Sequence, residues 1–151
     1  AGARGAAGLG MKVFLVRHAS AGKRTEWRGD DRLRPLDERG VRQAELLVEQ
    51  LAEALFERIV SSPFLRCVQT VEPLAAARGM TVETDEALSE GAGAEAALDL
   101  FRRLETDLVA CVHGDLCVEL LGRKARKGST AVLELGPAGD IQVLEQLEPA
   151  A

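Results

Sequence analysis

Three short apolar runs punctuate the chain, and they restrict the folds open to it more than any other feature. They are Lys12–Arg17, Arg58–Ser61 and Leu108–Val112. Each is too short for a core helix and is bounded by polar or turn-forming sequence, which is typical of a strand buried on both faces. Because longer segments with helical periodicity lie between them, the pattern predicts an α/β fold with a largely parallel central sheet.

The intervening segments carry helix signals. Asp37 is suited to cap the first helix, where apolar residues recur every three or four positions. Pro63 fits the first turn of the second helix, and Gly79 ends it. The expected helices span residues 37–54, 63–78, 95–105 and 116–121. Packed on both faces of the sheet, they predict a three-layer sandwich.

Three further strands complete the prediction, at Thr81–Thr84, Ala131–Leu135 and Ile141–Leu147. A length of 151 residues fits one domain, which we place at residues 11–151. Residues 1–10 lack the apolar core of a signal peptide and are expected to form a flexible tail or linker. No stretch is long and apolar enough to span a membrane, so we expect a cytoplasmic protein.

The chain has two histidines, and both directly follow an apolar run. His18 follows the first run and His113 the third, so each lies at the carboxyl end of a predicted strand. In open α/β sheets, that edge is where ligands bind. One histidine there is commonly an ordinary core or surface residue, but two at one edge predict a site. The non-periodic loop over residues 19–36 starts at the same edge, and loops of this length are commonly functional.

The charge balance limits the class of ligand. A net charge of -5 disfavours a broad nucleic-acid-binding face, which would be basic. It leaves room for a small basic pocket that attracts an anion, and Arg17 and Arg66 are placed to line one. The three cysteines lie in apolar surroundings, so we expect them to be buried and not to bind zinc.

Four motifs resemble those of the histidine phosphatase superfamily. Leu15–Ala19 is similar to its Arg-His-Gly motif, in the form common in the SixA-like branch of protein phosphohistidine phosphatases. Ser61–Thr70 is similar to its Ser-Ser-Pro-x-x-Arg-x-x-Gln-Thr block, and Val112–Gly114 to its second histidine motif. Arg34–Ala44 resembles its Leu-Thr-x-x-Gly-x-x-Gln-Ala block. The resemblance runs from about Met11 to Leu147 and implies a phosphoglycerate mutase-like fold. Members of the family differ in the size of a cap over the site, and the short stretch from Met80 to Asp107 implies a minimal cap here.

The resemblance implies a role for each charged or imidazole residue. His18 would attack phosphorus and carry the phosphoryl group, while Arg17, Arg66 and His113 would hold its oxygens. Arginine suits this role because its planar donors match phosphate, and imidazole is a nucleophile only when neutral. Because this cluster supplies the positive charge, neither a metal nor a cofactor is expected.

The loops supply further candidates. Ser20 and Lys23 lie in the loop after the first strand, and we expect Ser20 in particular to contact substrate. Leu88–Glu90 is similar to the Leu-x-Glu segment of the phosphoglycerate mutase branch, in which the glutamate donates a proton to the leaving group. Asp85 and Glu86 compete with Glu90 for this role.

The predicted activity is hydrolysis of a phosphomonoester or phosphohistidine through a phosphohistidine intermediate on His18. The partner would be a phosphorylated protein or a small phosphorylated molecule, with no nucleic acid and no membrane. Two alternatives stay open: a phosphoglycerate mutase-like phosphotransferase, which needs a site closed to water, and a non-catalytic phosphate-binding interaction module. The chain is also similar to the phosphatase domain behind a Nudix hydrolase in some actinobacterial proteins, where residues 1–10 would be the interdomain linker.

Overall fold

The computed structural model describes residues 10–149, so the tail or linker expected at the amino end lies outside the described residues except for Gly10. Within that range six strands form one sheet in the order β3-β2-β4-β1-β5-β6. The strands are β1 (Met11–Arg17), β2 (Arg58–Ser61), β3 (Val82–Thr84), β4 (Leu108–Val112), β5 (Thr130–Leu135) and β6 (Ile141–Leu147). The first four are mutually parallel, and β5 and β6 add antiparallel pairs at one edge. The predicted α/β class and largely parallel sheet are confirmed.

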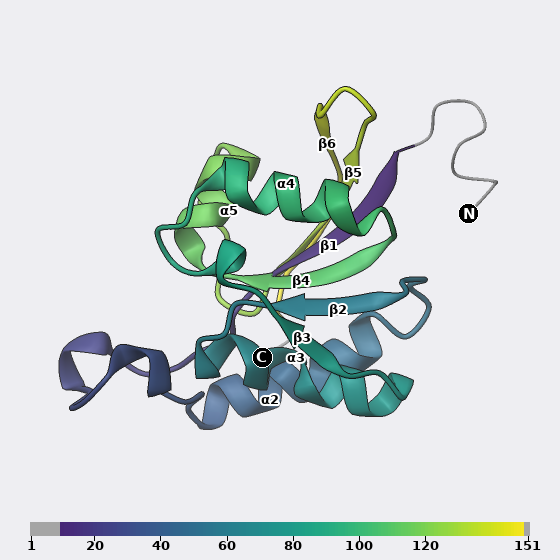
Figure 1. Ribbon diagram of the computed structural model, residues 1–151. Helices are drawn as coiled ribbons and strands as arrows, with labels where there is room; N and C mark the ends of the chain where they lie inside the picture. Colours follow the sequence, from purple (N-terminus) through teal and green to yellow (C-terminus); the bar gives the residue numbers. More distant parts are fainter. Residues whose placement is uncertain (1–9, 150–151) are drawn as a thin grey trace.

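Helices cover both faces of this sheet (Figure 1). They are α2 (Glu38–Gln50), α3 (Leu65–Arg78), α4 (Ala94–Leu104) and α5 (Gly114–Leu121). In Figure 1, α4 and α5 lie above the sheet and α2 and α3 below it, which is the predicted three-layer arrangement. Between β3 and α4 the described chain has one 3₁₀ turn, η4 (Glu86–Leu88).

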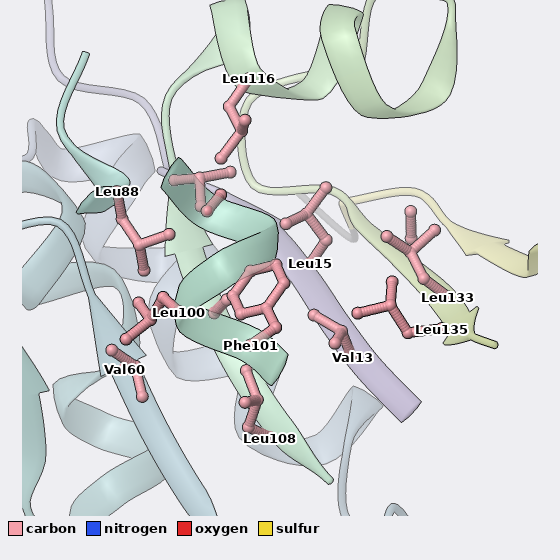
Figure 2. Packing of buried hydrophobic residues seen from close by; sticks show 14 of the residues in the cluster. Val13, Leu15, Val60, Leu88, Leu100, Phe101, Leu108, Leu116, Leu133 and Leu135 are labelled. Atoms are coloured by element: carbon pink, nitrogen blue, oxygen red, sulfur yellow. The ribbon is translucent and has the colours of Figure 1, made fainter. Parts of the chain in front are cut away.

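The alternation of side chains along β1 divides the core in two. Val13 and Leu15 point to the face that α4 and α5 cover, and Phe14 and Val16 point to the face of α2 and α3. Figure 2 shows the first cluster, in which Phe101 of α4 packs over β1. Phe101 is fully buried, and truncation of such a ring to alanine costs about 3–5 kcal/mol of stability.

The helix that follows Asp37 is shorter than predicted. The Asp37 carboxylate accepts a hydrogen bond from the Gly40 N–H at 2.8 Å, so the predicted cap is confirmed. The helix ends at Gln50, however, not at residue 54, because Ala52 and Ala54 bond to carbonyls three residues back and tighten the chain into a turn. Leu55, which continues the apolar spacing of this helix in the sequence, therefore lies beyond its end and is 80% exposed.

Two other helices begin elsewhere than predicted. α3 begins at Leu65 because the Phe64 N–H bonds to the Ser62 hydroxyl at 3.2 Å and keeps the segment after Pro63 extended. α5 begins at Gly114, two residues before the predicted start, so His113 directly precedes the helix. These corrections place the start of each helix against the carboxyl end of the sheet.

Candidate active site

The sheet fixes the backbone at the end of β1. The Arg17 N–H donates to the Ser129 carbonyl at 3.0 Å, and the Arg17 carbonyl accepts from the Gly128 N–H at 3.0 Å. On the other side, the His18 N–H donates to the Val112 carbonyl of β4 at 3.0 Å. Because Arg17 pairs in register with Val112, the next residues along the two chains, His18 and His113, are brought together.

The His18 side chain is held in one tautomer. Its Nδ1 lies 2.9 Å from the Ala19 carbonyl, which can only accept, so Nδ1 carries the proton and Nε2 keeps its lone pair. The Ala19 N–H in turn donates to Thr70 Oγ1 of α3 at 2.9 Å. Among residues 10–149, no group is hydrogen-bonded to Nε2.

His18 is also kept neutral. Its side chain is buried, with 6% of the residue exposed. This burial lowers the pKa of His18 to about 3, and the nearby His113, Arg66 and Arg17 act in the same direction against the Ala19 hydrogen bond. A neutral imidazole with an unengaged Nε2 is a competent nucleophile at neutral pH.

His113 packs edge-on against His18, with ring centroids 5.5 Å apart. The Phe64 ring lies on another side, at 4.6 Å between centroids. His113 Nε2 is 2.9 Å from Ser62 Oγ, just after β2, and 3.5 Å from Cys67 Sγ in the first turn of α3. These contacts fix the ring beside His18.

Arg66, the second residue of α3, is only 1% exposed. Its guanidinium donates to the Asp31 carbonyl at 2.8 Å and to the Asp31 carboxylate at 3.0 Å, and it lies 3.8 Å from the Glu90 carboxylate. Asp31 belongs to the 3₁₀ turn η3 (Asp31–Leu33) in the loop after β1 and also accepts from Arg34 at 3.0 Å. An acidic side chain thus occupies part of the Arg66 fork in the free protein.

Three buried nitrogens around His18 have no partner. They are Arg17 Nε, Arg66 Nε and His113 Nδ1, which make up half of the buried unpartnered side-chain atoms within residues 10–149. A buried polar atom without a partner costs about 1–3 kcal/mol, so such atoms are rare away from ligand sites. All three side chains lie close enough to His18 to lower its pKa, so they indicate a site for an anionic group rich in hydrogen-bond acceptors.

A cleft of about 670 Å³ opens over this cluster. Most of its charged lining residues are cationic: Arg17, Lys23, Arg24, Arg34, Arg66, Lys124 and Lys127. Two acidic residues, Glu90 and Asp115, also line it. Because the whole chain carries a net charge of -5, this concentration of positive charge is local, and it suits an anionic ligand.

The remaining predicted residues take different places. Both oxygens of Glu90 accept from Arg24 Nη2, at 2.8 and 2.9 Å, at the rim of the cleft. The Ser20 hydroxyl donates to the Asp37 carboxylate at 2.7 Å and does not line the cleft, whereas Lys23 does. A role in substrate contact for Ser20 and in proton donation for Glu90 stays a prediction.

Some lining residues were missed in the sequence. Asp115 accepts from the Gly91 N–H at 2.7 Å, and its other oxygen is buried without a partner in the described part of the chain. Its position two residues after His113 is a signal that could have identified it. No pattern in the loops pointed to Lys124 or Arg24, which also line the cleft.

A metal site and a membrane span each require a feature that is absent from the described residues. No group of three or more His, Cys, Asp and Glu side chains is arranged to hold a metal ion in that part of the chain. No helix there is long and apolar enough to cross a membrane. The three cysteines are buried and free, as predicted.

The chain is similar in sequence to known enzymes that act on phosphorylated molecules. The 8-oxo-(d)GTP phosphatase of Mycolicibacterium smegmatis is 35% identical over 155 residues, covering 91% of this chain and 48% of that protein. A probable phosphoglycerate mutase, GpmB, of Yersinia pestis is 36% identical over 84 residues, covering 53% of this chain and 38% of that protein. The chain thus spans about half the length of the first relative and less of the second.

The fold has solved counterparts. The protein histidine phosphatase SixA, in complex with tungstate, superposes with a TM-score of 0.75 at 24% identity, covering 92% of this chain and 97% of that one. This likeness confirms the fold expected for a SixA-like chain. The model of the histidine phosphatase superfamily (branch 1) matches residues 13–114, a segment that includes His18, Arg66 and His113. The chain therefore belongs to branch 1 of the histidine phosphatase superfamily.

Proposed function

We propose that the protein is a SixA-like phosphatase that hydrolyses phosphomonoester or phosphohistidine substrates by way of a phosphoryl group carried on His18. The observation that carries the proposal is the state of His18, which is neutral, has a free Nε2 and is surrounded by unpartnered buried nitrogens. A phosphate-binding module would need the hydrogen-bond donors but would not need a nucleophile fixed in this tautomer. We therefore prefer an enzyme over a non-catalytic binding module.

The first step is attack on phosphorus. The Nε2 lone pair of His18 forms a P–N bond as the bond from phosphorus to the leaving group breaks. Charge spreads over the three non-bridging oxygens in this transition state. Arg17, Arg66 and His113 would donate to those oxygens, which stabilises the transition state more than the ground state.

The second step restores the enzyme. Water attacks the phosphohistidine, inorganic phosphate leaves, and His18 returns to its neutral Nδ1–H form. Glu90 is the proposed proton donor to the leaving group and acceptor from water. Because both of its oxygens bond to Arg24, donation requires that ion pair to open.

A nucleotide phosphate is a second candidate substrate. It is supported by the 8-oxo-(d)GTP phosphatase that is 35% identical over most of this chain. A phosphoglycerate mutase-like transfer has less support, because a mutase must exclude water from its phosphohistidine, whereas the described segment between β3 and α4 contains only a short turn.

Rapid quenching with ³²P-labelled substrate tests the proposal. Wild-type protein should yield a labelled species that is stable in base and lost in acid, as expected of a P–N bond, and His18→Asn should yield none. Circular dichroism of the variant shows whether the fold is retained. Turnover near the wild-type level in a folded His18→Asn protein, or label on another residue, would refute the assignment of His18.

A further inference from the structure

The cleft carries more positive charge than one phosphoryl group uses. Arg66 and Arg34 pair with Asp31, and Arg24 pairs with Glu90. The lysines that line the cleft are different, since in the described residues none forms an ion pair: Lys23, Lys124 and Lys127. These unpaired charges are available to a ligand that extends beyond the transferred phosphoryl group.

The loop that holds two of these lysines is anchored to the catalytic strand. Arg17 donates to the Ala125 carbonyl at 2.6 Å, between Lys124 and Lys127 in the sequence. The Gly128 N–H donates to the Arg17 carbonyl at 3.0 Å. The backbone of this loop is therefore held at the end of β1, while the side chains of the two lysines reach solvent.

Lys127 lies within the field of the guanidinium groups. Partial burial lowers the pKa of Lys127, and the charges of Arg17, Arg34 and Arg66 lower it further, while Asp37 opposes them. This mutual repulsion in the free protein would be relieved by an anion placed between Lys127 and the arginines.

The acidic side of the cleft points to the same kind of substrate. Both oxygens of Glu90 accept from Arg24, so Glu90 can protonate an alkoxide only after this ion pair opens. A phosphate leaving group needs no such proton, because it departs as a stable anion. A cleft of about 670 Å³ is also far larger than a single phosphate requires.

We propose that Lys124 and Lys127 form a subsite for a second phosphate, so that the cleft accepts phosphoanhydrides. This inference rests on the proposed function of His18. Nε2 forms a bond to the terminal phosphorus, the P–O–P bond breaks, and the adjoining phosphate leaves with the electron pair, stabilised by the two ammonium groups. Water then cleaves the P–N bond and releases inorganic phosphate.

Kinetics with matched substrates test the subsite. We would measure kcat/KM for p-nitrophenyl phosphate, AMP and ADP in wild type and in a Lys124→Ala/Lys127→Ala double variant. Wild type should prefer ADP to AMP. The double variant should lose about tenfold more on ADP than on p-nitrophenyl phosphate, equivalent to about 1.4 kcal/mol shared between two partly exposed ion pairs. Arg126→Ala is the matched control, because Arg126 lies in the same loop but does not line the cleft, and it should leave both rates unchanged.

Inhibition gives a second measurement that needs no anhydride turnover. Inorganic pyrophosphate should inhibit p-nitrophenyl phosphate hydrolysis more strongly than inorganic phosphate in wild type, and the double variant should lose this difference. Equal losses on ADP and p-nitrophenyl phosphate, or a preference for AMP over ADP, would overturn the subsite while leaving the role of His18 intact. Absence of both phosphoenzyme and turnover with every substrate would instead overturn the proposed function.

Discussion

Acidification is the perturbation that most directly tests the state of His18. In the folded protein burial lowers its pKa to about 3, from 6.5 for an exposed imidazole. Between these two values the unfolded chain binds a proton on His18 and the folded chain does not. The stability that follows from keeping His18 neutral is therefore fully present above pH 6.5 and is lost as the pH falls toward 3.

The size of the loss follows from the shift. Each pH unit below 6.5 removes about 1.4 kcal/mol of unfolding free energy through this one residue. A drop from pH 6.5 to pH 5 should therefore cost about 2 kcal/mol. Asparagine at position 18 does not titrate, so a His18→Asn protein should lack this component while it keeps the contributions of all other groups.

Urea unfolding of both proteins at pH 7 and pH 5 measures how much His18 contributes to the pH dependence of the unfolding free energy. The wild type should lose about 2 kcal/mol more than His18→Asn over this interval. NMR of the imidazole nitrogens gives an independent check, since the chain has two histidines and the variant assigns their signals. His18 should stay in its Nδ1–H form down to pH 4. Equal acid sensitivity of the two proteins, or a titration midpoint near 6.5, would refute the argument that His18 is desolvated and neutral.

Three further variants test the site. Arg66→Lys keeps the charge but not the planar fork, and it should lower kcat/KM by about 10²–10³-fold; an unchanged value would remove Arg66 from the site. Glu90→Gln should slow alkyl phosphates by about 10²–10⁴-fold and phosphohistidine only slightly. Equal slowing of both would mean that Glu90 acts through its pair with Arg24 and not as an acid. Gly114→Ala would place a Cβ 2.8 Å from the Arg17 guanidinium carbon and should raise KM while the melting temperature changes little. An unchanged KM would show that Arg17 does not hold the substrate.

The sequence predicted the fold, and it predicted that the two histidines lie at one edge of the sheet, because both follow from simple rules of sheet geometry. Short apolar runs between helices specify a parallel sheet, and the residues after such strands meet at one edge. His18 and His113 follow strands that pair in register, so their meeting required no knowledge of the rest of the molecule. Arg66 could be placed because α3 starts at the same edge.

Other features depended on packing that no local pattern records. The contact of Asp31 with Arg66 joins residues 35 apart and exists only because the loop after β1 folds over α3. The start of α3 differs from the prediction because a hydrogen bond from the Phe64 N–H to the Ser62 hydroxyl outweighs the preference of proline for a first helical turn. Arg24 and Lys124 lie in loops without periodicity, so their approach to the cleft could not be predicted.

The place of β1 between β4 and β5 has an evolutionary consequence. A central strand tolerates few changes, because both of its neighbours depend on its register, whereas surface loops accept substitution and insertion. Here the proposed nucleophile follows the central strand, and the lysines proposed to meet the leaving group lie in a loop. Mutation can therefore alter which molecule is dephosphorylated while the imidazole that takes the phosphoryl group stays where it is. Such an arrangement permits relatives with different substrates, and this chain is similar both to a nucleotide phosphatase and to a probable phosphoglycerate mutase.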